Sequence, residues 1–346
     1  MKTEAAILVQ TGAPLQLVEL EIPVLKPGQA LVEILYSGVC GTQVLECRGH
    51  KGEDRFLPHC LGHEGTGIVR ETGPGVTKVK AGDKVMLSWI KGSGADVPGS
   101  VYSWDGKKVN SGALATFNRF SVTSENRLTV LPAEIPMREA ALLGCAAATG
   151  LGTVINTLGA RPGQSIAVFG TGGVGLCAIM GAHLSGCAPI IAVDIRKNKL
   201  EAARKLGATH LIDASACDPL KEIAALVKGG LDLAVESSGS PAVIPQALAC
   251  VRSQGGAAAV IGNARYGAKA EIDPAQFNQG KRLLGTWGGD TVPDRDYPRY
   301  MRLLASGRLD LGALISRSYK LAETGAAIDN LEAGDDLRPM IDMSLK

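Results

Sequence analysis

The chain has 346 residues, of which 45% are hydrophobic and 20% are charged, and its formal net charge is +2. A chain of this length is too long for one ordinary hydrophobic core, so two domains are expected. The nearly balanced charge gives no support for a general nucleic-acid-binding role or for binding to an anionic membrane.

The first part of the chain is expected to be rich in β-strands. Four short apolar segments have strand character: residues 5–9, 30–35, 65–69 and 84–87. A Pro27-Gly28 turn precedes the second of these segments. Their irregular spacing, with turn residues between them, predicts a β-rich domain rather than a helical one.

From about residue 165 the pattern changes to alternating strands and helices. Strands are expected at 165–169, 190–193, 211–212, 231–235 and 257–261, and helices at 174–184, 197–206, 219–228 and 241–252. This alternation predicts a parallel, doubly wound sheet. The last stretch, with helices near 296–306 and 322–333 and a strand at 340–341, is expected to return to the first domain. The predicted domains are therefore 1–150 with 288–346, and 151–287.

A glycine-rich loop follows the first strand of the alternating region. Gly170, Gly172, Gly173, Val174 and Gly175 lie between an apolar strand and a helix, the context in which a G-x-G-x-x-G motif binds a dinucleotide. Asp194 ends the next strand, 19 residues after Gly175, where a carboxylate can bind a ribose 2′-hydroxyl. That carboxylate would repel a 2′-phosphate, so NAD is favoured over NADP. The positive charge of the neighbouring Arg196 is the one feature here that favours NADP. The alternative is a strand–turn–helix that binds no ligand.

Three residues far apart in the sequence, Cys40, His63 and Cys145, form a candidate zinc site. Two thiolates and one imidazole suit zinc, and three protein ligands leave a fourth position open for water or substrate. Taken singly, the cysteines could be buried structural thiols and His63 a turn residue. Thr149 follows Cys145 by four residues, so on a helix both would share one face, with Thr149 able to contact the nicotinamide.

Over nearly its whole length the chain resembles the zinc-dependent medium-chain alcohol dehydrogenases. The matching segments are Cys40-Gly41-Thr42, Leu61-Gly62-His63-Glu64-Gly65, residues 79–85, Leu143-Gly144-Cys145 through Thr149-Gly150, the glycine loop and Leu337-Arg338-Pro339. The resemblance implies an α/β protein, with a GroES-like β-rich catalytic domain beside a Rossmann cofactor domain.

The resemblance also implies roles for individual residues. Cys40, His63 and Cys145 would be the catalytic zinc ligands, with Glu64 as their acidic neighbour and Thr42 as the hydroxyl that takes the substrate proton. Other positions would contact NAD: Lys199 assists Asp194 at the adenosine ribose, Arg338 contacts the pyrophosphate, and Ile261, Gly285 and Trp287 hold the nicotinamide carboxamide. Trp89 would form a wall of the substrate pocket.

The chain departs from this family pattern at several positions. Residues 88–112 contain no cysteine, so a second, Cys₄ zinc site is excluded and one zinc per chain is expected; the segment could be a mobile loop or a subunit contact. Gln43 stands where relatives often have an Asp that orients the ligand histidine, and its carbonyl oxygen could accept the same hydrogen bond. Leu45 replaces a relay histidine of some members. Ser111 and Gly112 suggest a wider, more polar pocket.

The predicted function is zinc-dependent interconversion of an alcohol and an aldehyde or ketone, with hydride transfer to or from NAD. A polyol or sugar-type dehydrogenase, a zinc-free reductase of the same fold and a non-catalytic NAD-binding regulator are the alternatives. A small-molecule alcohol is the expected partner, in a homodimer or homotetramer. Broken apolar runs, the early Glu4 and eight scattered cysteines predict a cytoplasmic protein without a membrane helix.

Overall fold

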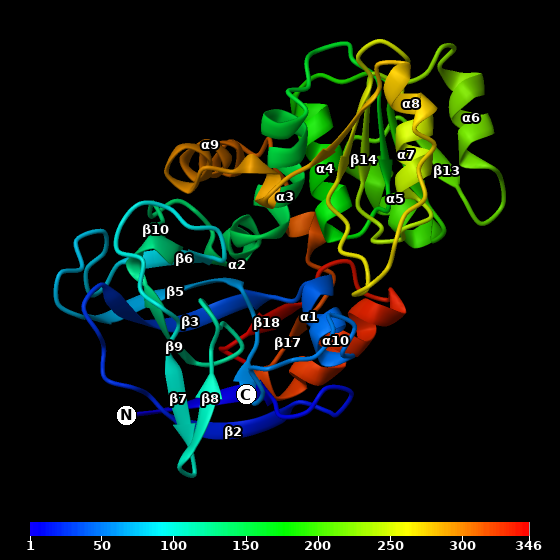
Figure 1. Cartoon of the computed structure of the whole chain (residues 1–346). Coiled ribbons are helices and arrows are strands. Elements are labelled where there is room, and N and C mark those ends of the chain that lie inside the picture. The colour runs from blue at the N-terminus through cyan, green and yellow to red at the C-terminus, as the bar shows by residue number, and fades with distance from the viewer. Residues whose placement is uncertain (346) are drawn as a thin grey trace. The chain divides into compact units, whose positions relative to one another are not determined.

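The computed structural model describes residues 1–345, which form two compact units (Figure 1). Unit 1 comprises Met1–Cys145 together with the C-terminal stretch from Val292, and unit 2 comprises Ala146–Thr291. The expected first boundary, after residue 150, lies five residues beyond Cys145, and the expected second boundary, at residue 288, lies four residues before Val292. Cys145 is thus the last residue of unit 1 before the chain enters unit 2.

Unit 1 is built on two β-structures. The first is a closed barrel of β1 (Lys2–Leu8), β2 (Gln16–Glu21), β7 (Val101–Trp104), β8 (Lys107–Asn110) and β4 (His59–Cys60). The second is a seven-stranded sheet of β10 (Leu128–Val130), β6 (Lys84–Ser88), β5 (Glu64–Thr72), β3 (Gln29–Gly38), β18 (Met340–Asp342) and β17 (Ser318–Tyr319), with β9 (Phe120–Ser124) also paired to β3. The long strand β3 pairs antiparallel with β5, β9 and β18.

The helices of unit 1 are α1 (Gly41–Cys47), α2 (Met137–Ala140), α9 (Pro293–Ala305) and α10 (Thr324–Ala333). A core of buried side chains from β3, β5 and β6 includes Val32, Ile34, Val69 and Leu87, and Ile328 of α10 belongs to it. Because β18 pairs with β3 and α10 supplies core residues, the C-terminal stretch is an integral part of unit 1.

Unit 2 has the strand order of a dinucleotide-binding fold. Its six parallel strands lie in the order β13 (His210–Asp213), β12 (Ile190–Asp194), β11 (Ile166–Phe169), β14 (Leu233–Glu236), β15 (Ala257–Val260) and β16 (Arg282–Gly285). This 3-2-1-4-5-6 arrangement is that of the Rossmann fold. The helices are α3 (Ala146–Gly152), α4 (Gly173–Leu184), α5 (Lys197–Lys205), α6 (Pro219–Leu226), α7 (Ile244–Ala249) and α8 (Ala275–Asn278).

The sequence explains these elements of unit 2. All four residues of β11 and of β14 are buried, as expected for parallel strands covered on both faces. Asp218 caps α6 by accepting a hydrogen bond from the Leu220 backbone N–H, and Pro219 occupies the first helical position. The predicted α/β fold, with a β-rich domain and a Rossmann domain, is confirmed.

No single helix among residues 1–345 is long and apolar enough to cross a membrane. Two consecutive helical stretches, Met137–Gly144 and Ala146–Thr157, pass that test of length and composition only when they are taken together.

Candidate active site and metal centre

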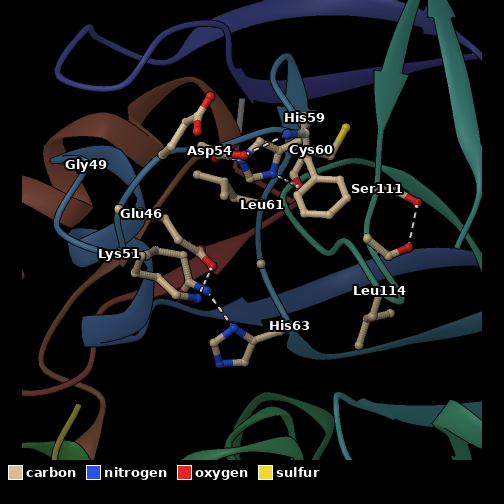
Figure 2. A pocket seen from close by; sticks show the side chains of 16 residues that line it. Glu46, Gly49, Lys51, Asp54, His59, Cys60, Leu61, His63, Ser111 and Leu114 are labelled. Atoms are coloured by element: carbon tan, nitrogen blue, oxygen red, sulfur yellow. Dashed lines mark hydrogen bonds and ion pairs between the residues drawn. The ribbon is translucent and has the colours of Figure 1, made fainter. Parts of the chain in front are cut away.

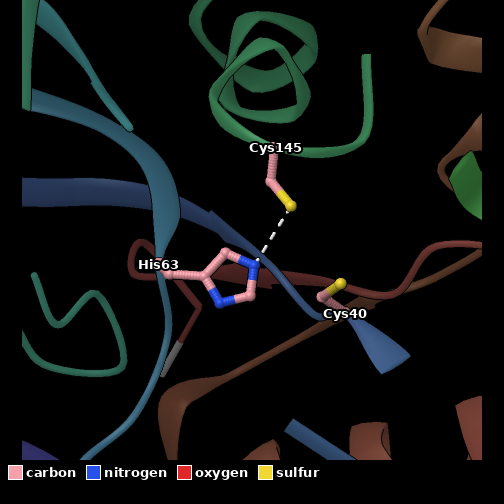
Figure 3. A group of neighbouring side chains, drawn as sticks. All are labelled: Cys40, His63 and Cys145. Atoms are coloured by element: carbon pink, nitrogen blue, oxygen red, sulfur yellow. Dashed lines mark hydrogen bonds between the residues drawn. The ribbon is translucent and has the colours of Figure 1, made fainter. Parts of the chain in front are cut away.

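Cys40, His63 and Cys145 come together in unit 1, as Figure 3 shows. Cys40 lies between β3 and α1, His63 immediately precedes β5, and Cys145 follows the 3₁₀ turn Ala141–Gly144. One ligand atom from each residue lies within 4.8 Å of the others, and His63 Nε2 is 3.1 Å from Cys145 Sγ. Among residues 1–345 this is the one group of metal-ligating side chains with that geometry.

The donor set of this cluster fits zinc. Thiolate sulfur and imidazole nitrogen are preferred zinc ligands, and a site with three protein ligands keeps a position for water or substrate. A hydrogen bond from Cys145 lowers the pKa of the Cys40 thiol, and the positive charge of Arg338 lowers it further against the effect of burial. The same hydrogen bond raises the pKa of Cys145. The pKa values of the two thiols are thus shifted in opposite directions by the hydrogen bond that they share.

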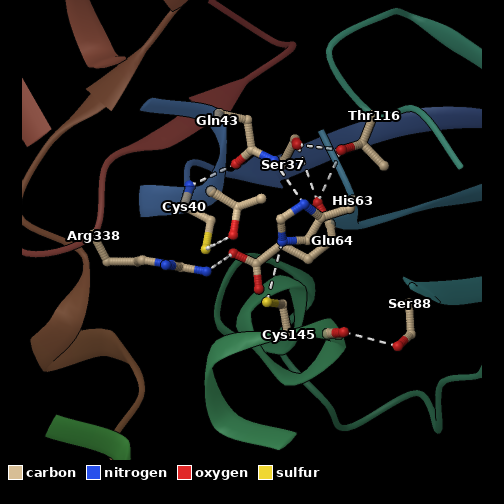
Figure 4. A network of polar contacts seen from close by, with 11 residues as sticks. Ser37, Cys40, Gln43, His63, Glu64, Ser88, Thr116, Cys145 and Arg338 are labelled. Atoms are coloured by element: carbon tan, nitrogen blue, oxygen red, sulfur yellow. Dashed lines mark hydrogen bonds and ion pairs between the residues drawn. The ribbon is translucent and has the colours of Figure 1, made fainter. Parts of the chain in front are cut away.

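Hydrogen bonds fix the two chain segments that carry His63 and Cys145 (Figure 4). The Ser37 and Thr116 hydroxyls both donate to the backbone oxygen of Glu64, at 3.0 and 3.1 Å. The Ser88 hydroxyl donates to the backbone oxygen of Gly144, at 2.7 Å, and is 2.6 Å from the Tyr297 hydroxyl. The ligand positions are thus held by contacts inside unit 1.

The expected helical relation between Cys145 and Thr149 is wrong. Cys145 has φ −144° and ψ −72°, which is not helical, and α3 begins only at Ala146. Because Cys145 lies in a non-helical turn, the turn sets the direction of its thiol. The four-residue spacing to Thr149 therefore does not place the two side chains on one helix face.

Gln43 presents its amide nitrogen to His63, where the carbonyl oxygen was expected. Its Oε1 accepts a hydrogen bond from the Cys40 backbone N–H at 2.8 Å, so its Nε2 is the atom that faces His63 Nδ1, at 2.6 Å. The reason is local, because Gln43 is the third residue of α1 and closes a capping box with Cys40 at the helix start. Gln43 is buried.

Glu64 and Arg338 form a buried ion pair next to the cluster (Figure 4). Burial raises the pKa of Glu64, although Arg338 opposes this effect. Within unit 1 Arg338 is 2% exposed, and its guanidinium is paired with Glu64. Contact of Arg338 with a pyrophosphate stays a prediction. Thr42 lies at the start of α1, with its Oγ1 3.8 Å from Cys40 Sγ.

A cavity of about 360 Å³ reaches His63 and Gln43 (Figure 2). Its polar wall contains two pairs: Lys51 Nζ lies 2.9 Å from Glu46, and His59 Nε2 lies 2.8 Å from Asp54. The remaining lining residues are mostly apolar or small: Gly49, Gly52, Glu53, Phe56, Cys60, Leu61, Gly62, Ser111, Gly112 and Leu114. Sequence reasoning placed Ser111 and Gly112 at such a pocket. It missed Glu46 and Leu114, for which the sequence holds no distinguishing signal.

Trp89 does not line this cavity. It follows β6, and its backbone oxygen accepts a hydrogen bond from Arg127. Its role as a wall of the substrate pocket stays a prediction.

The cysteine-free segment 88–112 contains a β-hairpin that joins the barrel. Strands β7 and β8 are connected by Asp105-Gly106, which both have positive φ, as a tight two-residue hairpin requires. The buried carboxylate of Glu125 accepts hydrogen bonds from the backbone N–H groups of Ala95, Thr77 and Lys78, at 2.8–2.9 Å. Through the Glu125 carboxylate, hydrogen bonds therefore connect Ala95 of this segment with Thr77 and Lys78.

In unit 2 the glycine loop connects β11 to α4. Gly170 has φ +85°, and a Cβ atom on Gly175 would lie 1.9 Å from the Gly170 oxygen, so neither position accepts a larger residue. Gly172 is the N-cap of α4, and Gly173 and Val174 form its first turn. Asp194, at the end of β12, accepts hydrogen bonds from the Thr171 backbone N–H and hydroxyl, at 2.7 and 3.0 Å. The loop and Asp194 are thus brought together at one edge of the sheet.

The other expected cofactor residues of unit 2 lie at separate places. Lys199 is in α5, and burial lowers the pKa of its ammonium group while Asp194 raises it. Ile261 and Gly285 lie at the carboxyl ends of β15 and β16, the edge of a Rossmann sheet at which ligands bind. Trp287 is 74% exposed, and Thr149 lies within α3.

Two family models match the chain. Residues 26–133 match the alcohol dehydrogenase GroES-like domain, and residues 173–306 match the zinc-binding dehydrogenase family. S-(hydroxymethyl)glutathione dehydrogenase of Synechocystis sp. is 32% identical, over 99% of this chain and 100% of that protein. The protein of the same name from Paracoccus denitrificans is 30% identical over the same shares.

Solved structures agree with these sequence matches. An alcohol dehydrogenase zinc-binding domain protein from Burkholderia ambifaria is similar with a TM-score of 0.90, 31% identity and 99% of each chain covered. Benzyl alcohol dehydrogenase from Acinetobacter calcoaceticus is similar with a TM-score of 0.91 and 30% identity, again over 99% of each chain. The likeness therefore extends through both units.

Proposed function

The chain belongs to the zinc-dependent medium-chain alcohol dehydrogenases, and on that premise we propose which of its residues carry the reaction. The enzyme interconverts an alcohol and an aldehyde or ketone. The convergence of Cys40, His63 and Cys145 is the observation that carries the proposal, because these residues provide the sulfur and nitrogen ligands that the reaction needs in one place.

We assign the zinc to Cys40, His63 and Cys145. When bound there, zinc supplies Lewis acidity that lowers the pKa of the substrate hydroxyl. Thr42 Oγ1 would accept the hydroxyl proton while its own O–H proton passes on to water, a role supported by its position beside the Cys40 thiol. The buried Glu64, paired with Arg338, contributes a fixed negative charge beside the ligands. The cluster and its polar neighbours all belong to unit 1.

We propose NAD as the hydride acceptor. The glycine loop Gly170–Gly175 would receive the pyrophosphate at the start of α4, and Asp194 would bind the adenosine ribose. The negative charge of a carboxylate at that place favours a ribose hydroxyl over a phosphate, which it would repel. Lys199 would support Asp194, Arg338 would contact the pyrophosphate, and the nicotinamide would lie near Thr149, Ile261 and Trp287.

We assign the cavity at His63 to the substrate, with Trp89 as a further wall. The cavity has an apolar side near Leu61 and Leu114 and a polar side with Lys51, Asp54 and His59. An alcohol with an additional polar group suits such a lining better than a plain hydrocarbon alcohol. A polyol dehydrogenase is the second candidate, because paired donors and acceptors such as Asp54 and His59 can bind further hydroxyl groups.

The function is tested by following NADH formation from NAD with a panel of alcohols. The panel contains aromatic, aliphatic and polyhydroxylated alcohols and S-(hydroxymethyl)glutathione, and each is repeated with NADP. We expect turnover with at least one alcohol and a preference for NAD. Binding of NAD without turnover of any alcohol by zinc-loaded protein would instead support a non-catalytic regulator.

We also propose that the enzyme is a homodimer or homotetramer. Among the described strands, β16 pairs only with β15, so its other edge is available to a strand of a second copy. Light scattering on the purified protein determines the mass; a monomer at micromolar concentration would contradict this proposal.

A further inference from the structure

The hydrogen bonds of Gln43 have a direction, which follows from the atoms that surround this side chain. The Cys40 backbone N–H can only donate, so the Gln43 atom 2.8 Å from it must be the oxygen. The amide nitrogen then points at His63 Nδ1, at 2.6 Å, and an amide NH₂ can only donate. Nδ1 of His63 must therefore carry a lone pair.

The position of the His63 hydrogen follows from this lone pair. A neutral imidazole has one N–H, so with Nδ1 as acceptor the hydrogen is on Nε2. Nε2 lies 3.1 Å from Cys145 Sγ, which can accept it. With this orientation of the amide, every contact from the Cys40 N–H through Gln43 and His63 to Cys145 pairs a donor with an acceptor.

Zinc binding would break this arrangement, because Nε2 is the nitrogen that faces the two thiols. Nε2 must release its hydrogen to bind the metal, and a neutral ring then carries a hydrogen on Nδ1. That hydrogen would meet the NH₂ group of Gln43, donor against donor. Turning the amide over relieves this contact, but it places NH₂ against the Cys40 N–H and breaks the capping box at the start of α1.

We propose that Gln43 is a positioning residue whose single acceptor oxygen cannot serve both the Cys40 N–H and a His63 Nδ1–H, so that zinc binding through His63 Nε2 requires the Gln43 amide to turn over. The chain accordingly binds zinc more weakly than it would with a carboxylate at position 43. A carboxylate has two acceptor oxygens, so it can bind the Cys40 N–H and a His63 Nδ1–H at once. The inference rests on the assignment of Cys40, His63 and Cys145 as zinc ligands.

The test compares zinc affinity in three proteins by competition with a chelator under reducing conditions. Gln43→Glu keeps the length of the side chain and the capping box. Gly41→Asp is the control for charge: it adds one negative charge on the same helix turn, where a Cβ meets nothing within 4 Å. We expect Gln43→Glu to bind zinc about 10- to 100-fold more tightly than the wild type. Its increase in zinc affinity should be about tenfold larger than the increase in Gly41→Asp.

A second measurement reports the hydrogen position directly. Nitrogen NMR of metal-free protein with labelled histidine distinguishes the two tautomers, and the His63→Ala protein identifies His63 among the five histidines. We expect the hydrogen on Nε2 in the wild type and on Nδ1 in Gln43→Glu. Equal affinity gains in the two variants, or a wild-type hydrogen on Nδ1, would overturn the inference. Failure of the wild type and Gln43→Glu alike to bind zinc would instead refute the ligand assignment.

Discussion

The guanidinium of Arg338 is paired with the carboxylate of Glu64 in the interior of unit 1, directly beside the Cys40 thiol. The two side chains are separated by 274 residues in sequence, and both are almost completely buried. The pair links the C-terminal stretch before β18 to the strand that follows His63. It therefore connects these two segments of unit 1 and places an ion pair beside the proposed metal ligands.

Replacing Arg338 with methionine should be strongly destabilising. The change leaves the Glu64 carboxylate buried without its ion-pair partner, and such a loss typically costs about 3–5 kcal/mol. Denaturant unfolding of the metal-free protein measures the effect. The double variant Glu64→Gln/Arg338→Met should lose less unfolding free energy than the two single variants together, because it also removes the Glu64 charge. Additive losses would contradict the coupling between the two residues.

Cys40→Ser and His63→Ala should each remove the zinc. Each change takes one of three protein ligands from the site, and two ligands do not hold zinc tightly. Metal analysis of the purified proteins should give one zinc per chain for the wild type and almost none for the variants. Cys187→Ser, a buried cysteine of unit 2, is the control and should keep the metal. Full zinc content in either ligand variant would refute the assignment.

Glu125→Gln should loosen the segment that precedes the hairpin of β7 and β8. Burial alone raises the pKa of Glu125, but the N–H groups of Ala95, Lys78 and Thr77 outweigh it, so the pKa is lowered. A glutamine has one acceptor oxygen, so at least one N–H loses its partner, at a cost of about 1–3 kcal/mol. Denaturant unfolding measures the loss, and exposed Glu134→Gln is the control.

The effect of Glu125→Gln should also depend on pH. A lowered pKa in the folded state means that the carboxylate stabilises the protein above the ordinary glutamate pKa of about 4.3. This contribution is lost as the pH falls through the lower, folded-state pKa. The difference between the wild type and Glu125→Gln should therefore shrink on acidification below about pH 4. A difference that stays constant down to pH 3 would argue against an ionised Glu125.

Asp194→Gly should relax the preference for NAD. The change removes a carboxylate that would repel a 2′-phosphate, and Arg196 remains beside it to attract one. The ratio of kcat/KM with NADP to kcat/KM with NAD should rise at least about tenfold, or ~1.4 kcal/mol. Asp213→Asn, at the end of the neighbouring strand β13, is the matched control. An unchanged ratio in Asp194→Gly would refute its role at the ribose.

Asp54→Asn should weaken binding of polar alcohols in the cavity at His63. The carboxylate accepts hydrogen bonds from the Phe56 N–H and lies 2.8 Å from His59 Nε2, so its loss disturbs the polar wall. We expect KM for a polyhydroxylated alcohol to rise about tenfold, with kcat and zinc content little changed. Exposed Glu71→Gln on β5 is the control. The same KM in Asp54→Asn would place the substrate elsewhere.

The sequence by itself determined the fold class of both units and singled out the three residues that we propose as metal ligands. Strand and helix periodicity and the glycine loop are local signals, and they predicted five of the six strands and four of the six α-helices of unit 2, with small errors at the ends. They missed β16, α3 and α8. Cys40, His63 and Cys145 were recognised by residue type and local context, because zinc chemistry restricts its ligands to few side chains.

Only the tertiary structure decided how the surroundings of these ligands are arranged. The sequence could not show that Arg338 lies on Glu64, that Glu125 holds the segment before the hairpin, or that Asp54 and His59 form one wall of a cavity. The orientation of Gln43 was predicted wrongly, because it depends on two partners at once: the Cys40 N–H and the His63 ring. A hydrogen bond has a direction set by every donor and acceptor within reach, and that set exists only after the chain has folded.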